Sequence, residues 1–162
     1  MKNLYLVRHA KSSWKFDVSD HERPLKKRGT IDAHLVSNYL KGKIKKPDMV
    51  ISSDANRAKT TAEIFTSILG IEESIIEYDH ELYDFSGFKL TKVIKECDDS
   101  INTLMIFGHN YALTHFVNEF GDKFIDNVTT SGFTHIALDI DSWQDLKKGR
   151  TILTVFPKDL KS

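Results

Sequence analysis

The sequence has little of what marks a secreted or membrane-spanning protein. Cys97 is the one cysteine among its 162 residues, so no intramolecular disulfide can form. No apolar stretch approaches the roughly 20 residues that a membrane span needs. Arg8 and Lys11 interrupt the first apolar run after four residues, so we expect no secretion signal here. These absences together predict a cytosolic location.

Neither sign of charge is in excess. Lysine plus arginine and aspartate plus glutamate both number 23, which gives zero net charge. Proteins that bind nucleic acid or a membrane surface normally carry a basic excess, so we expect neither partner. Glycine and proline are also sparse, at 8 and 3 residues, and no repeat or linker divides the chain. The length therefore predicts a single domain over residues 1–162.

Short apolar runs alternate with segments of helical periodicity. The runs are continuous, as in strands buried on both faces of a parallel sheet, and lie at residues 4–7, 49–51, 75–76 and 104–107. Apolar stripes with helical spacing occupy residues 30–40, 57–69, 90–97 and 113–120. This alternation predicts an α/β fold, a three-layer α/β/α sandwich with a mainly parallel central sheet. Two later strands, at 133–140 and 151–156, predict a C-terminal hairpin at the sheet edge.

Cationic or imidazole side chains follow three of the predicted strands. Arg8 and His9 end the first strand, and His109 follows the strand at 104–107 through Gly108. Arg57 comes in the first turn of the helix after the strand at 49–51, with Asp54 or Ser53 expected as its cap. Ligands of open parallel sheets bind beyond the carboxyl ends of the strands, so we expect these four side chains to converge.

Two guanidiniums and two imidazoles gathered at one place would repel one another without an anion. Arginine presents a planar fork that suits phosphate, and helix N-termini add N–H donors. Histidine also serves as a covalent nucleophile. The cluster therefore predicts a phosphate site in which one imidazole can bond to phosphorus while the other groups hold the oxygens.

Four segments carry a family resemblance: "LVRHAKSSW", "DHERPLKKRG", "SSDANRAKTTA" and "GHN". They resemble the histidine phosphatase superfamily, in particular its short SixA-type phosphohistidine phosphatase branch. The resemblance implies that His9 attacks phosphorus and becomes phosphorylated, that Arg8, Arg57 and His109 hold the phosphoryl oxygens, and that water then hydrolyses the phosphohistidine. No metal or cofactor is implied. Attack requires one ring nitrogen of His9 to be unprotonated while the other donates to a fixed acceptor, for which we expect a backbone carbonyl.

The sequence departs from this pattern at two points. The branch usually continues its second histidine motif as His-Asn-Pro-Gly, whereas Tyr111 and Ala112 follow Asn110 here. Larger members also carry a carboxylic acid that protonates the leaving group, and Glu81 in "HELYDFSG" is the candidate here. The sequence evidence for such an acid is weak. Because a protonated imidazole leaves readily and an alkoxide does not, this favours a phosphohistidine substrate.

Three further residues are candidates for contact with phosphate or substrate. Ser12 lies in the loop after His9, where stabilising a turn is an equal alternative. Arg23 belongs to "DHERPL", which is expected to form a mainly structural, salt-bridged loop beside the pocket. Ser131, with Thr130, resembles a family loop near the pocket.

The remaining chemically active residues fit simpler roles. Zinc motifs place histidines or cysteines at fixed spacings, which are absent around His34, His80, His115 and His135, so we expect no metal site. Cys97 occupies an apolar helix position and is expected to pack rather than react.

The sequence leaves three functions to compare. The first is a phosphatase that removes phosphate from histidine in a protein. The second is a small-molecule phosphomonoesterase of the same superfamily, and the third is a phosphate-binding module without catalysis; a mutase would need a clearer acid. The partner is thus a phosphorylated protein or a small phosphate ester. A short chain has little room for an insertion over a small ligand, which favours an open pocket that admits a protein side chain.

Overall fold

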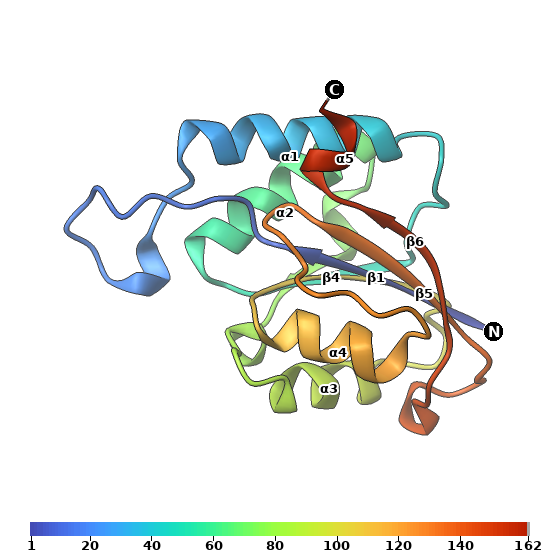
Figure 1. Ribbon diagram of the computed structural model, residues 1–162. Coiled ribbons are helices and arrows are strands. Elements are labelled where there is room, and N and C mark those ends of the chain that lie inside the picture. The colour runs from blue at the N-terminus through green and yellow to red at the C-terminus, as the bar shows by residue number, and fades with distance from the viewer. Residues whose placement is uncertain (162) are drawn as a thin grey trace.

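A computed structural model describes residues 1–161, and within them six strands form one sheet (Figure 1). The strands are β1 (Lys2–Arg8), β2 (Met49–Ser52), β3 (Ile76–Tyr78), β4 (Thr103–Gly108), β5 (Phe133–Leu138) and β6 (Arg150–Val155). Their order across the sheet is β3-β2-β4-β1-β5-β6. The first four strands are parallel, whereas β5 runs antiparallel to β1 and pairs with β6 as an antiparallel hairpin at the edge. The predicted mainly parallel sheet with an edge hairpin is confirmed.

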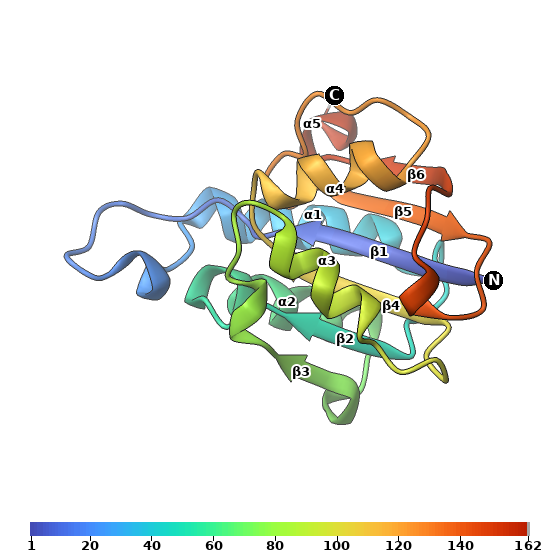
Figure 2. The ribbon, with the colours of Figure 1, turned by 90° about the horizontal axis from the view of Figure 1, so that it is seen from below.

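Helices cover both faces of the sheet. Figures 1 and 2 show one layer with α1 (Lys27–Leu40), α2 (Asn56–Leu69) and α5 (Pro157–Leu160), and an opposite layer with α3 (Phe88–Lys95) and α4 (Ala112–Phe120). Short 3-10 helices lie in the connections: η1 (Asp20–Glu22), η2 (Glu73–Ile75), η3 (His80–Leu82) and η4 (Trp143–Asp145). Among the described residues, no helix has the length and apolar character needed to cross a membrane.

The central strands send alternate side chains into two cores. Leu4 and Leu6 of β1 pack in the core beneath α3 and α4, and Tyr5 and Val7 pack in the core beneath α1 and α2. Every residue of β4 is buried. Burial on both faces explains why these strands read as continuous apolar runs rather than alternating ones.

One predicted strand has different surroundings from those expected. Ile75 lies in η2, and β3 begins at Ile76 as the outermost strand of the sheet. The prediction of a doubly buried strand is wrong here, because β3 has a single neighbour and its side chains are half-buried or exposed. Cys97 follows α3 and packs against the core as predicted, and burial raises the pKa of its thiol to about 11.

The strand order brings three carboxyl ends to one edge of the sheet. β4 lies between β1 and β2, with Arg8 opposite Gly108 and Ser52 opposite Phe107. Residues that follow these strands are therefore neighbours in space, although about 50 residues separate each from the next along the chain.

Candidate active site

His9, Arg57 and His109 meet beyond these strand ends. The backbone N–H of His9 donates to the carbonyl of Gly108 at 3.1 Å, which joins the ends of β1 and β4. The two imidazole rings lie with centroids 5.1 Å apart. Arg57 Nε donates to His9 Nε2 across 3.4 Å. Arg8 completes the group at the cavity described below.

The ring of His9 is fixed in one tautomer by its own neighbour. Nδ1 lies 2.7 Å from the carbonyl oxygen of Ala10, and because a carbonyl can only accept, Nδ1 carries the proton. Nε2 is then unprotonated. Burial, together with the charges of Arg57 and Arg8, lowers the pKa of His9 to about 3, against the opposing effect of the Ala10 carbonyl.

Asp20, which the sequence analysis did not single out, bonds directly to Arg57. Its carboxylate accepts from Arg57 Nη2 at 3.0 Å, from Arg23 Nε at 3.0 Å and from the Tyr83 hydroxyl at 2.5 Å. Burial acts to raise the pKa of Asp20, but the Tyr83 hydroxyl and the Arg57 charge outweigh it and lower that pKa to about 2. The available signal was Asp20 three residues before Arg23 in "DHERP", a pairing distance within one helical turn.

His109 is held by Ser53. The Ser53 hydroxyl oxygen accepts the N–H of Ala55 at 3.2 Å and lies 2.8 Å from His109 Nε2. If the hydroxyl gives its proton to Nε2, the His109 proton lies on Nδ1, which is buried and has no partner among residues 1–161. Burial, then the neighbouring His9 and Arg57, lowers the pKa of His109 to about 2, so this ring is neutral.

The predicted cap of α2 is wrong. Ala55 stands at the N-cap position and makes no side-chain cap bond. The Asp54 carboxylate instead accepts hydrogen bonds from His21 and His80, and the Ser53 hydroxyl accepts one from the N–H of Ala55.

A cavity of about 510 Å³ opens over Arg8, His9 and Arg57, whereas the buried His109 lies behind His9 and is not among the lining residues. Its lining includes five cationic residues and a single carboxylate, which are Arg8, Lys11, Arg23, Lys26, Arg57 and Asp20. The other lining residues are His9, Ser12, Trp14, Phe85, Asn110 and Thr130. In a chain with zero net charge, this local excess of positive charge favours a multiply charged anion.

The structure brings Ser12 and Arg23 to the cavity, where Arg23 Nη1 donates to Ser12 Oγ at 2.7 Å. Arg23 also stacks on the ring of Trp14 at 3.5 Å. Ser131 lies behind the cavity wall instead: its N–H donates to the carbonyls of Arg8 and His9, and Thr130 lines the cavity in its place.

Glu81 is also outside the cavity lining. Its carboxylate pairs with Lys92 of α3 at 3.1 Å and is partly exposed. The structure therefore does not place the candidate acid from the sequence beside His9.

Side-chain hydrogen bonds of Asn110 stabilise the turn after His109, although its sequence departs from the family motif. Asn110 Oδ1 accepts from the N–H of Thr114 at 3.1 Å and from its hydroxyl at 2.8 Å, and Asn110 Nδ2 donates to Asn127 Oδ1 at 2.8 Å. Tyr111, where the family has proline, points to solvent and is 71% exposed.

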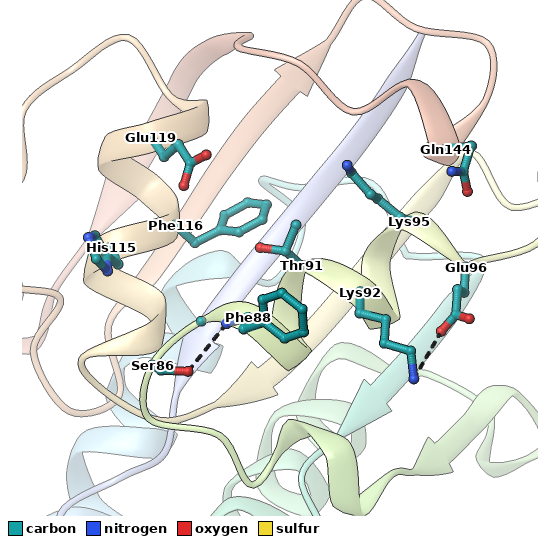
Figure 3. Close-up of a pocket in the computed structure, with 11 residues that line it drawn as sticks. Ser86, Phe88, Thr91, Lys92, Lys95, Glu96, His115, Phe116, Glu119 and Gln144 are labelled. Atoms are coloured by element: carbon teal, nitrogen blue, oxygen red, sulfur yellow. Dashed lines mark hydrogen bonds and ion pairs between the residues drawn. The ribbon is translucent and has the colours of Figure 1, made fainter.

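A second cavity, of about 590 Å³, lies between α3 and α4 (Figure 3). Its charged lining is mixed, with Lys92 and Lys95 opposed by Glu96 and Glu119. It contains none of the four side chains that converge at the strand ends, and its balanced charge gives no preference for an anion.

Comparison with known proteins identifies the family. Residues 4–105 match the model of the histidine phosphatase superfamily (branch 1). The chain belongs to this superfamily. An uncharacterized protein of Mycobacterium tuberculosis is 32% identical over 103 residues, 64% of this chain and 62% of that protein. An uncharacterized chloroplastic protein of Arabidopsis thaliana is 32% identical over 118 residues, 67% of this chain and 54% of that protein. The chain thus spans less than two thirds of the length of these relatives.

The fold is that of the protein histidine phosphatase SixA. The structure of SixA complexed with tungstate superposes with a TM-score of 0.78 and covers 98% of this chain and 99% of that one, at 23% sequence identity. The predicted three-layer histidine phosphatase fold is confirmed.

Proposed function

We propose that this chain is a phosphatase that transfers a phosphoryl group from its substrate to His9 and then to water. The observation that carries the proposal is the state of His9 Nε2. This nitrogen is unprotonated because Nδ1 is committed to the Ala10 carbonyl, and it lies beside Arg57 at a cavity rich in cations. A neutral imidazole in a positive, anion-binding cavity is what nucleophilic attack on a phosphate requires.

In the first step the lone pair of His9 Nε2 forms a bond to phosphorus while the bond from phosphorus to the leaving group breaks. Arg8, Arg57 and His109 hold the phosphoryl oxygens as charge develops on them. The phosphorylated ring carries positive charge, which the Nδ1–H bond to the Ala10 carbonyl stabilises.

In the second step a water oxygen bonds to phosphorus and the P–N bond breaks. The electron pair returns to Nε2, the water proton passes to solvent or to the departing phosphate, and the free enzyme is restored. Arg23 has a supporting role in this scheme, because it holds Ser12 and Asp20 at the cavity wall.

The chemistry of the leaving group supports phosphohistidine as the substrate. Asp20 is the single carboxylate that lines the cavity within residues 1–161, and its low pKa keeps it ionised at neutral pH. An alkyl phosphate needs a protonated acid beside the departing oxygen, whereas an imidazole that is already protonated leaves as a neutral ring. With Glu81 turned to Lys92, the site is better matched to a phosphoramidate than to an alkyl ester.

The rim of the cavity supports a protein as the carrier of that phosphohistidine. Trp14 is 78% exposed and lines the cavity, and Phe16 is 56% exposed on the same segment, which projects from the body of the molecule ahead of η1 (Figure 1). Phe85 is another lining residue with an exposed ring. Exposed aromatic side chains beside a site are typical of surfaces that contact a macromolecule. A phosphoprotein substrate also agrees with the cytosolic location expected from the sequence.

Phosphate release from two substrate classes tests the proposal. The substrates are a phosphohistidine-bearing protein and two small esters, p-nitrophenyl phosphate and glycerol phosphate. Phosphate release from each is measured with the native chain, with His9→Ala and with the matched control His34→Ala, whose histidine is exposed on α1. We expect turnover of the phosphohistidine protein, a loss of more than about 10³-fold in kcat/KM for His9→Ala, and no loss for His34→Ala. Reactions quenched in base, where the P–N bond of phosphohistidine is stable, should show one phosphoryl group on His9 in the native chain.

Each other outcome favours a different function. Turnover of glycerol phosphate in preference to the protein would make the chain a small-molecule phosphomonoesterase. Tight phosphate binding with no turnover of any substrate would make it a phosphate-binding module and would contradict the mechanism.

A further inference from the structure

Three side chains with metal-binding atoms meet beside the active site, on segments far apart in the sequence. His21 lies on η1, Asp54 in the connection between β2 and α2, and His80 on η3. His21 Nε2 is 2.8 Å from Asp54 Oδ1, and His80 Nδ1 is 3.0 Å from both oxygens of that carboxylate. All of these donor atoms lie within 4.8 Å of one another.

The spacing is close to what a transition-metal ion requires. A tetrahedral zinc ion with bonds of about 2.0–2.1 Å holds its donor atoms roughly 3.3 Å apart. The two histidine–carboxylate pairs are already at 2.8 and 3.0 Å, and the two ring nitrogens lie within 4.8 Å of each other. Small side-chain rotations that move these atoms by a few tenths of an ångström to about one ångström would make room for an ion. Two imidazoles, one carboxylate and a water molecule form a ligand set that zinc commonly takes.

The protons of the two rings are compatible with metal binding. Each ring now donates an N–H to Asp54, and a metal would take the place of those hydrogens. A neutral imidazole can free the nitrogen by moving its proton to the other ring nitrogen, which is Nδ1 in His21 and Nε2 in His80. The positions of the coordinating atoms therefore need to change little on binding.

The rings are also held in place from behind. Tyr83 packs edge-on against His21, with centroids 5.0 Å apart, and lies 5.6 Å from His80. Its own hydroxyl is fixed by the bond to Asp20. Because Tyr83 already restricts the motion of both imidazoles, they lose less conformational entropy when an ion binds.

We propose that His21, Asp54 and His80 form a binding site for a divalent transition-metal ion, zinc in preference to magnesium because two of the three ligands are imidazoles. The ion fastens η1 to the β2–α2 connection and to η3. These segments carry Asp20 and lead into Arg57, so the bound metal stiffens one wall of the cationic cavity without contacting His9. The site is independent of the proposed phosphatase chemistry, which uses no metal.

Cobalt(II) titration of the chelator-treated chain of 162 residues tests the site, since tetrahedral cobalt absorbs visible light strongly and octahedral cobalt in water only weakly. We expect one equivalent to bind with tetrahedral bands and zinc to displace it. His80→Ala should weaken cobalt binding by more than about tenfold, since loss of even an outer-shell partner changes metal affinity by roughly 10–100-fold. Because His80 is exposed, this variant is expected to fold, and circular dichroism checks that it does.

Two matched variants separate this site from other histidines. His34→Ala removes an exposed imidazole elsewhere, and His9→Ala removes an imidazole of the phosphate cavity; both should bind cobalt as the native chain does. The proposal is overturned if the native chain shows no tetrahedral cobalt bands, if His80→Ala binds as tightly as the native chain, or if His9→Ala loses binding. None of these readings depends on turnover, so the metal site and the phosphatase proposal can fail separately.

Discussion

Asp20 occupies hydrogen-bonding positions on Arg57 and Arg23 that a phosphoryl group also needs. Replacing it in Asp20→Asn removes the single negative charge that residues 1–161 contribute to the cavity lining and keeps the shape of the side chain. We expect phosphate and tungstate to bind about three- to tenfold more tightly, which is the scale of one partly screened charge interaction. Calorimetric titration at constant pH measures this. Asp17→Asn, at an exposed residue of the same projecting segment, is the control, and weaker binding by Asp20→Asn would show that Asp20 is needed to position Arg57.

His9 and His109 are both expected to stay neutral far into the acid range. Burial is the largest cause, and it lowers their pKa values to about 3 and about 2. In long-range ¹H–¹⁵N spectra recorded from pH 8 to pH 5, the ring nitrogens of both should keep the shifts of neutral imidazole, with the proton of His9 on Nδ1. Assignment uses His9→Gln and His109→Gln. A midpoint near that of a histidine in a short peptide would contradict the buried, neutral nucleophile.

At the scale of elements, α1 approaches the loop after His9 so closely that its third residue has to be glycine. A Cβ added at Gly29 would lie 2.1 Å from the carbonyl oxygen of Lys11. Gly29→Ala should therefore displace the Lys11–Ser12 wall of the cavity. We expect a loss of about 1–3 kcal/mol in the free energy of unfolding, as overpacking causes, together with reduced phosphatase turnover.

Urea unfolding and kcat/KM measure both effects of Gly29→Ala. Gly42→Ala, in the turn at the other end of α1, is the control: its φ of 79° strains an alanine, but nothing lies within 4 Å. That variant should lose stability and keep full turnover. Unchanged turnover in Gly29→Ala would mean that the approach of α1 has no influence on the cavity.

The elements also show why the sequence predicted part of the site and missed the rest. Arg8 ends a strand, His9 and His109 directly follow strands, and Arg57 lies in the first turn of the helix after one. Because the carboxyl ends of parallel strands meet at one edge of the sheet, their convergence could be inferred from the apolar runs. Asp20 and the histidine pair around Asp54 lie in connections whose paths depend on long-range packing. Glu81 had the right type and neighbourhood in sequence, but its orientation is set by Lys92 on α3.

In the whole molecule, the residues of the candidate site lie at one end of the strands, and a buried, hydrogen-bonded lysine that stabilises the fold lies at the other. At the end of β1 away from His9, the buried Lys2 ammonium donates to the carbonyls of Asp99 and Ile101 and to Asn102 Oδ1, and it lies over the ring of the buried Trp143. Five residues of β1 lie between it and Arg8, so the two are about 20 Å apart along the strand. Lys2→Met would leave three oxygen acceptors without this donor.

We therefore expect Lys2→Met to lower the free energy of unfolding by about 2–4 kcal/mol while kcat/KM stays unchanged at temperatures where the variant is folded. Urea unfolding and steady-state kinetics measure the two quantities. Lys15→Met, which removes an exposed lysine, should change neither. A fall in kcat/KM for Lys2→Met would show that the far end of the sheet influences the site.

The two buried, neutral histidines also determine how the free energy of unfolding of the whole molecule changes with pH. The unfolded chain takes up a proton on each histidine near pH 6.5, whereas folded His9 and His109 resist it until about pH 3 and about pH 2. Between these limits the unfolded state binds more protons, so the free energy of unfolding should fall as the pH falls, by up to about 1.4 kcal/mol per pH unit for each ring. Urea unfolding at pH 7, 6 and 5 measures this slope. His9→Gln and His109→Gln should each flatten it, because glutamine in the same place takes up no proton in either state; an unchanged slope in both would mean that other groups cause the loss of stability in acid.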